Sequence, residues 1–187
     1  MIKVSKNLTK RQALALAFGM ASVVTVVGVE VVSRVGKAFA KDDPSLITAN
    51  AATATAFLEK TAKEPGVKAL PSGVLYKVIS SGPSDGVPPR REDEVKVHYE
   101  GKLVSGDIFD SSFQRGAPAV MQLGRLIPAW IEALQKMKPG DEWILYVPPA
   151  LGYGEQGAGP IPPNSVLIFR IQLIGVLPAA GSTGFGH

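Results

Sequence analysis

Apolar and polar residues alternate along much of the chain from residue 72 onward, which is typical of half-buried β-strands. Every second residue is apolar in Val95-Lys-Val-His-Tyr99, and the same is true of residues 143–147 and 167–173, where some of the residues between are apolar as well. We expect strands near 74–79, 95–100, 108–110, 120–123, 143–147 and 167–173. Loops rich in Gly and Pro, the longest at 148–163, separate several of these segments.

Two segments have helical character instead. The first is Ala-rich and runs from Ser45 to Lys63, after Asp43-Pro44 and before Pro65-Gly66, which are start and stop signals. One short helix cannot bury its own apolar face. It therefore packs on the body of the protein, packs on a second copy of the chain, or frays, and the sequence leaves these three possibilities open.

The second helix begins at Pro128 and is expected to end at Lys138-Pro139-Gly140. Trp130, Ala133, Leu134 and Met137 form one apolar stripe at helical spacing. The body is therefore predicted to be an α+β domain, an antiparallel sheet with one helix laid across it.

The N-terminus has the three parts of a secretory signal peptide. Four basic residues precede an uncharged run at 13–29, and Ala38-Phe39-Ala40 is a small-x-small cleavage site. The alternative is an uncleaved anchor over residues 13–32, because such a run approaches the length of a membrane-spanning helix. Residues 9–14 loosely resemble a twin-arginine signal, with Lys10 in place of the first arginine. Either way we expect an exported body, in the bacterial periplasm or anchored to the inner membrane.

Composition and charge narrow the possible functions. The chain has no cysteine, which excludes disulfides, thiolate metal sites and a cysteine nucleophile. Of its 20 basic and 16 acidic residues, six basic and one acidic lie in residues 1–40, which leaves 14 basic against 15 acidic beyond them. The body is thus nearly neutral, and we expect no nucleic-acid partner.

Two apparent chemical motifs do not support an active site. Residues 152–157 fit G-x-G-x-x-G, but a Pro-rich stretch that cannot open a helix follows, so we expect no dinucleotide site. The acidic pairs at 93–94, 107/110 and 141–142 are interpreted as solvated turn residues rather than as a glycosidase pair. We expect no metal and no cofactor.

Five stretches, taken together, resemble the FKBP-type peptidyl-prolyl cis-trans isomerases. They are residues 95–101, 106–112, 126–134, 151–154 and 161–169, in the order and near the spacing of that family. The resemblance covers residues 91–177 and points to the exported bacterial branch that includes the macrophage infectivity potentiator. Residues 66–77 also resemble that branch.

The resemblance implies an antiparallel β half-barrel wrapped on one short α-helix, with an apolar pocket between them. The implied substrate-binding residues are Tyr99, Phe109, Asp110, Met121, Leu126, Ile127, Trp130, Tyr153, Ile161 and Phe169, with Asp110, Tyr153 and Tyr99 as the catalytic set. Trp130 would lie beneath the proline ring, the Ile127 N–H and the Tyr153 hydroxyl would hold substrate carbonyls, and Asp110, bonded to Tyr99, would stand near the prolyl amide. Proline-containing polypeptides would be the substrates, and macrolides the inhibitors.

Three residues depart from the family pattern: Met121 stands for Phe, Ala129 for Gly and Gly152 for Ala. Methionine adapts to irregular gaps, so we expect activity to survive. The predicted domains are a signal or anchor (1–40), a helical appendage and linker (41–71), the isomerase domain (72–178) and a disordered tail (179–187). A folding chaperone with incidental isomerase activity is the alternative function, and an inert scaffold is a third.

Overall fold

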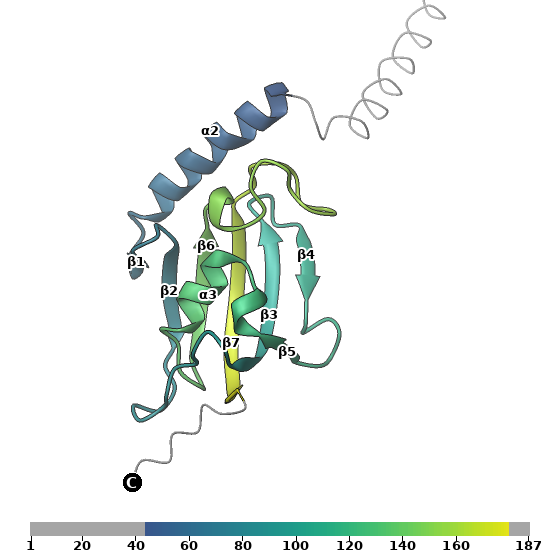
Figure 1. Ribbon diagram of the computed structural model, residues 1–187. Helices are drawn as coiled ribbons and strands as arrows, with labels where there is room; N and C mark the ends of the chain where they lie inside the picture. Colours follow the sequence, from purple (N-terminus) through teal and green to yellow (C-terminus); the bar gives the residue numbers. More distant parts are fainter. Residues whose placement is uncertain (1–43, 180–187) are drawn as a thin grey trace, which may run out of the picture. The chain divides into compact units, whose positions relative to one another are not determined.

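The computed structural model describes residues 44–179, which belong to one compact unit (Figure 1). Its helices are α2 (Pro44–Thr61) and α3 (Pro128–Leu134), with short 3-10 turns η2 (Leu123–Arg125) and η3 (Pro149–Leu151). Its strands are β1 (Val67–Ala69), β2 (Leu75–Ser80), β3 (Glu94–Leu103), β4 (Ile108–Ser111), β5 (Ala119–Gln122), β6 (Glu142–Val147) and β7 (Leu167–Leu177). The predicted signal or anchor, the N-cap Asp43 and tail residues 180–187 lie outside the described residues.

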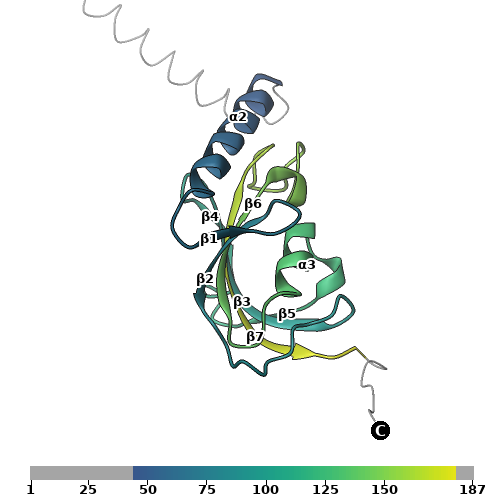
Figure 2. The same ribbon diagram turned by 90° about the vertical axis from the view of Figure 1, so that its left-hand side faces the viewer.

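The seven strands form one sheet in which every pair is antiparallel, as predicted. The order is β1-β2-β6-β7-β3-β4, and β5 pairs with β3. The long strands β3 and β7 lie side by side, with Val97 opposite Leu173 and Tyr99 opposite Ile171. The sheet curves around α3, which covers one face (Figure 2).

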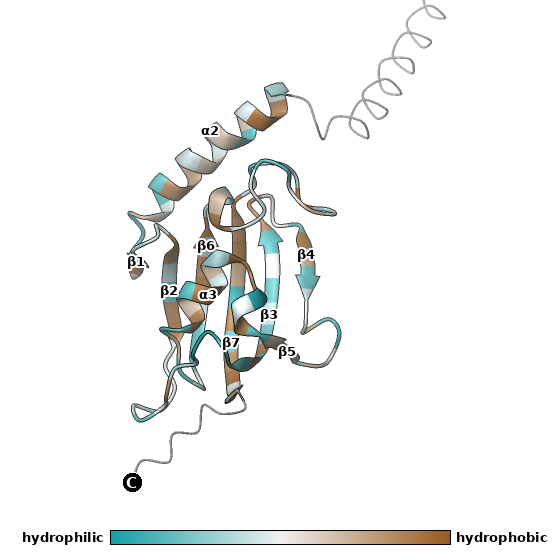
Figure 3. Ribbon diagram, viewed as in Figure 1, coloured by the Kyte–Doolittle hydropathy of each residue, from teal (hydrophilic) through white to brown (hydrophobic). Residues whose placement is uncertain are grey.

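The alternation seen in the sequence places one side of β3, β6 and β7 in the core. In β6, buried and partly exposed residues alternate at every position. Val97 of β3, Leu145 of β6 and Ile171 of β7 are all fully buried and belong to one apolar cluster with Trp130 of α3. Figure 3 shows β2, β6 and β7 as mainly hydrophobic strands beside the more hydrophilic β3. Burial of this face against α3 provides the main driving force for the fold.

Helix α3 is shorter than predicted, because it ends at Leu134 rather than at residue 138. The N–H of Lys136 bonds to the carbonyl of Ala133, and that of Met137 to the carbonyl of Leu134. These i→i−3 bonds tighten the last turn. Met137 still reaches the core, where it is fully buried.

Strand β1 was not predicted, although it pairs with β2 through Val67 opposite Lys77 and Ala69 opposite Leu75. It lies within residues 41–71, for which we expected only a helix and a linker. Three residues are too few to display a period of two. The division of the chain into four segments otherwise stays a prediction.

Helix α2 packs on the sheet domain, which selects one of the three possibilities left open by the sequence. Ala54 and Thr61 are buried, and the ring of Phe57 lies 6.3 Å from that of Tyr146 on β6. No helix within residues 44–179 is long and apolar enough to cross a membrane.

Candidate functional site

A cavity of about 410 Å³ opens between α3 and the curved sheet. All ten residues predicted to bind substrate line it: Tyr99, Phe109, Asp110, Met121, Leu126, Ile127, Trp130, Tyr153, Ile161 and Phe169. Ala158, Gly159 and Pro160, which the sequence analysis did not identify, complete the wall. The structure thus brings together residues from β3, β4, β5, α3, β7 and two loops. The roles assigned to them stay predictions.

The floor of the cavity is a cluster of aromatic rings. Trp130, only 4% exposed, lies with its ring centroid 5.2 Å from those of Tyr99 and Phe169, at interplanar angles of 84° and 86°. Phe109 meets Phe169 at 5.6 Å and 87°. Edge-to-face contacts of this kind are favourable and fix ring orientation. The floor is therefore a rigid apolar surface.

The aromatic floor depends on a residue without a side chain. Gly101 of β3 lies opposite Phe169 of β7. A Cβ at Gly101 would stand 2.6 Å from Cε2 of Phe109 and 2.7 Å from Cε1 of Phe169. Since such distances are well below van der Waals contact, only glycine lets both rings take their positions.

One polar atom in this floor is unusual. Nε1 of Trp130 is buried and has no hydrogen-bond partner among the described residues. Buried indole N–H groups normally find an acceptor, because leaving one unpaired costs free energy. The indole of Trp130 thus keeps an unused donor.

Asp110 supplies the charge at the edge of the cavity. The hydroxyl of Tyr99 donates to Oδ2 of Asp110, and Nη1 of Arg115 pairs with Oδ1. Nη2 of Arg115 also donates to the Tyr99 hydroxyl at 3.0 Å, and the guanidinium lies 5.5 Å from the Tyr99 ring centroid. These three side chains form a closed triangle of hydrogen bonds.

The triangle sets the protonation of its members. Burial acts to raise the pKa of Asp110, but the hydrogen bonds from Tyr99 and Arg115 outweigh it and leave the pKa below its usual value. Burial, together with the bond to Asp110, raises the pKa of the Tyr99 phenol above its usual value. At neutral pH Asp110 is therefore an anion and Tyr99 a neutral donor.

Arg115 is the functional candidate that the sequence analysis missed. Its side chain is half exposed and lies outside the cavity, in the loop after β4. The only available signal was an Asp followed five residues later by an Arg, which is too common to be informative.

Ser112 fixes the backbone beneath the triangle. The N–H of Tyr99 donates to Oγ of Ser112 at 2.7 Å, and the N–H of Ser112 returns to the Tyr99 carbonyl at 2.9 Å. Ser112 is fully buried just after β4. Its hydroxyl therefore ties the end of β4, and with it Asp110, to β3.

Two further segments place the remaining side chains. Pro128 occupies the first turn of α3 and Ile127 precedes it in extended conformation, so Ile127 and Trp130 lie one turn apart. Met121 of β5 lies opposite Val95 of β3. The start of α3 thus supplies Ile127 and Trp130, while the edge strand β5 supplies Met121.

The long loop before β7 forms the last wall. The N–H of Ile161 bonds to the carbonyl of Ala158, and the N–H of Ala158 to that of Ile161. Gly157 has φ +61°, and a Cβ there would stand 2.3 Å from the Ile161 carbonyl oxygen. Tyr153 is 41% exposed, whereas Ile161 is buried. Residues 152–157, which fit G-x-G-x-x-G, thus lead into a tight turn rather than into a helix.

Two members of the acidic pairs, Asp93 and Asp141, are buried and so differ from their interpretation as solvated residues, whereas Glu94 and Asp107 are exposed as interpreted. Asp93 and Asp141 are 5% and 4% exposed. Asp93 accepts from the N–H groups of Arg90 and Ala179, and Asp141 from those of Gly82 and Lys138. Hydrogen bonds from these backbone N–H groups offset the free-energy cost of burying each carboxylate. Each carboxylate therefore links the two chain segments that donate to it. Among residues 44–179, no three His, Cys, Asp or Glu residues lie close enough together to hold a metal ion.

The chain matches two family models. Residues 86–174 match FKBP-type peptidyl-prolyl cis-trans isomerase, and residues 12–78 match the domain amino terminal to FKBP-type peptidyl-prolyl isomerase.

Several known proteins are similar to this chain in sequence or in structure. The chain is 52% identical over 128 residues to peptidyl-prolyl cis-trans isomerase Mip of Coxiella burnetii, and 47% identical over 130 residues to the FKBP-type 22 kDa peptidyl-prolyl cis-trans isomerase of Escherichia coli. These matches cover 68% and 69% of the chain, but only 55% and 62% of the two relatives. The crystal structure of FkpA from Escherichia coli superposes with a TM-score of 0.69 at 35% identity, covering 93% of this chain and 84% of that one. The chain therefore belongs to the FKBP-type peptidyl-prolyl cis-trans isomerase family.

Proposed function

We propose that the chain catalyses cis–trans rotation about X-Pro peptide bonds in polypeptides. The observation that carries this proposal is the aromatic cavity, in which Trp130 and the rings of Tyr99 and Phe169 packed edge-on against it form an apolar floor. The ionised Asp110 at its edge adds one fixed charge.

The chemistry of the reaction fits such a cavity. Resonance opposes rotation of a peptide bond with a barrier of about 18–20 kcal/mol. The planar amide is charge-separated and well hydrated, so transfer to a dry aromatic surface disfavours it more than the twisted conformer. No bond is made or broken, and the reaction needs no nucleophile, metal or cofactor.

Each polar group at the cavity has a place in this reaction. The proline ring rests on Trp130, and Phe109 and Phe169 exclude water from it. The Tyr153 hydroxyl and the Ile127 backbone N–H donate to substrate carbonyls on either side of the bond. Asp110, held by Tyr99 and Arg115, lies near the prolyl amide, where a fixed charge favours one orientation of its dipole.

The substrates we propose are exported polypeptides that contain proline, with macrolides as competing ligands. The basic and apolar pattern at the N-terminus supports export to the periplasm. A relative in Legionella longbeachae, 46% identical, bears the name outer membrane protein MIP. Association with the inner membrane would occur only through residues 13–32, if they are retained.

The test is an isomerisation assay, protease-coupled or by NMR exchange, on the full chain with a panel of X-Pro peptides. We expect catalysis that a macrolide blocks and that Trp130→Leu lowers by about tenfold or more, the scale of a lost transition-state contact. Trp143→Leu is the matched control, because it removes another buried indole that stacks on Tyr76 and does not line the cavity. A folded, monodisperse chain without catalysis would overturn the proposal, and suppression of client aggregation by that chain would identify a chaperone.

A further inference from the structure

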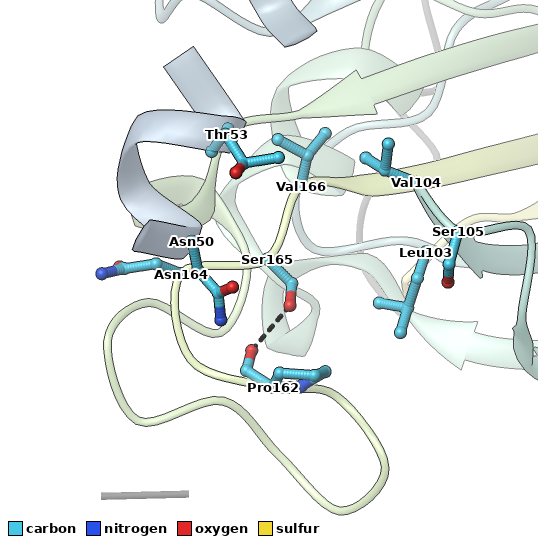
Figure 4. Close-up of a pocket in the computed structure, with 10 residues that line it drawn as sticks. Asn50, Thr53, Leu103, Val104, Ser105, Pro162, Asn164, Ser165 and Val166 are labelled. Carbon is cyan, nitrogen blue, oxygen red and sulfur yellow. Dashed lines mark hydrogen bonds between the residues drawn. The ribbon is translucent and has the colours of Figure 1, made fainter. Parts of the chain in front are cut away.

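The last wall of the aromatic cavity is also one wall of a second cavity. Residues 158–161 line the aromatic cavity. The residues that follow, Pro162 and 164–166, line a cavity of about 180 Å³ together with Asn50, Thr53 and Ala54 of α2 and with residues 103–105 (Figure 4). A single stretch of chain thus separates α2 from the candidate substrate site.

Two amide side chains connect α2 to this stretch. Nδ2 of Asn50 donates to the Pro163 carbonyl at 2.8 Å. In the opposite direction, Nδ2 of Asn164 donates to the Ile47 carbonyl of α2 at 3.1 Å. We call these two reciprocal bonds the amide clamp. Ile47 and Asn50 lie one turn apart, so both bonds use the same face of the helix.

The clamp uses the less exposed face of α2. Residues 47, 50, 51, 54, 57, 58 and 61 are the half-buried or buried positions of the helix. Their spacing is that of one helical stripe. Asn50 is therefore directed at the loop by the same packing that places Ala54 and Phe57 against the domain.

Asn164 links α2 to the loop that lines the aromatic cavity. Its backbone N–H donates to the Gly154 carbonyl at 2.9 Å, next to Tyr153. Asn164 is 9% exposed and is the one non-glycine residue among those described with positive φ, at 52°. Asn tolerates this left-handed conformation better than most residues. One residue thus binds both α2 and the chain that carries Tyr153.

We propose that Asn50 and Asn164 are positioning residues, through which α2 holds residues 152–164 so that Tyr153 and Ile161 face the substrate. This inference rests on the proposed isomerase function. Tyr153 and Ile161 border the substrate, whereas the Trp130 floor is built by α3 and the sheet. Loss of the clamp should therefore affect substrate binding more than the rate at which the bound substrate rotates, because the Trp130 floor and Asp110 stay in place.

The kinetic test compares KM and kcat of the full chain with those of Asn50→Asp, which keeps the shape of the side chain and removes its donor. We expect KM to rise about two- to tenfold, the range of one net hydrogen bond, with kcat unchanged within about twofold. Asn50→Gln, which keeps a donor, should recover part of the loss. Asn164→Gly, which keeps the left-handed backbone, should match Asn50→Asp.

Thr53→Ala is the matched control. Thr53 lines the same second cavity, but its hydroxyl bonds within α2, to the Ala49 carbonyl at 2.9 Å. Its KM should equal that of the unmodified chain. An unchanged KM in Asn50→Asp, or an equal rise in Thr53→Ala, would overturn the inference.

A measurement without substrate separates this inference from the proposed function. In Asn50→Asp, the amide resonances of residues 152–161 should shift and their hydrogen exchange should accelerate, while Thr53→Ala leaves both unchanged. If these resonances do not move, the clamp does not position the loop, whether or not the chain is an isomerase. If they move in a chain that lacks catalysis, the clamp stands and the isomerase function fails.

Discussion

Gly101 shows most directly how one residue shapes the cavity. The rings of Phe109 and Phe169 occupy the space that a Cβ at this position would need. Gly101→Ala should displace at least one ring, lower the free energy of unfolding by about 1–3 kcal/mol and reduce isomerase activity. Denaturant unfolding and the peptide assay measure the two effects.

The control for this variant is Gly175→Ala in β7, where a Cβ would meet nothing within 4 Å. Its stability and activity should stay close to those of the unmodified chain. Equal losses in both variants would mean that the steric argument at Gly101 is wrong.

Asp110 should make the free energy of unfolding depend on pH, in a direction that follows from its pKa shift. Its pKa in the folded chain lies below the usual value near 3.8, so the folded state favours the anion. The stabilisation is present above the unfolded pKa and is lost as pH falls through the folded pKa. The difference in unfolding free energy between the chain and Asp110→Asn should therefore be constant near neutral pH and be lost as pH falls through the folded pKa of Asp110.

The size of that difference is small, below about 1 kcal/mol, because a side chain 40% exposed is screened by water. Urea unfolding at a series of pH values measures it. Asp107→Asn, at an exposed turn, is the control for replacing a carboxylate by an amide outside the hydrogen-bonded triangle. A difference that grows as pH falls would contradict the assigned role of Arg115 and Tyr99.

At the scale of single residues, the sequence predicted the site residues that lie within the family motifs and few others. Ten of the thirteen residues that line the cavity could be named because their order and spacing resemble a known pattern. Arg115 could not, since its role depends on a loop that folds back over Tyr99 and Asp110. The buried states of Asp93 and Asp141 were missed for the same reason, because one donor to each carboxylate comes from a distant segment of the chain.

At the scale of secondary-structure elements, the junction of β3 and β4 holds Asp110, the charged residue at the edge of the cavity. The Ser112 hydroxyl is buried and accepts the N–H of Tyr99. Ser112→Ala would leave this buried N–H without its acceptor and should cost about 1–3 kcal/mol of stability. Isomerase activity should also fall, because the end of β4 positions Asp110.

Thermal or denaturant unfolding of Ser112→Ala tests this expectation. Ser105→Ala is the matched control, since Ser105 lies on an exposed turn and bonds only to the side chain of Asp107. We expect it to change stability by less than about 0.5 kcal/mol. If Ser112→Ala changed the stability as little as Ser105→Ala, the junction of β3 and β4 would not depend on the Ser112 hydroxyl.

The alternation of apolar residues was sufficient to predict the long strands, because one side of each faces the core. It failed for β1, which is short, and it placed the end of α3 too late. The stripe that includes Met137 continues past the helix, since an i→i−3 turn still brings that side chain into the core. A hydrophobic period therefore indicates burial more reliably than it indicates where a helix ends.

For the molecule as a whole, the cavity joins most elements of the domain, so a ligand in it should stabilise all of them together. At a concentration of about 100 times its Kd, a macrolide or substrate analogue should add about 2.7 kcal/mol to the unfolding free energy. Calorimetry of the full chain, with and without ligand, measures the shift. Trp130→Leu should reduce the shift, and an equal shift in that variant would place the ligand elsewhere.

The position of α2 could not be predicted at any scale of sequence analysis. Asn50 and Pro163 are 113 residues apart, and neither has a pattern that points to the other. Reciprocal amide bonds depend on the final backbone geometry, including the left-handed conformation of Asn164. Long-range polar contacts of this kind follow from the assembled fold.

The aromatic floor also makes the molecule its own optical probe. The chain has only two tryptophans, and Trp130 lines the cavity while Trp143 stacks on Tyr76 outside it. Replacing Trp143 with phenylalanine would leave a single emitter at the cavity floor. A ligand in the cavity would change the surroundings of this indole, so fluorescence would report arrival of a ligand without an added label.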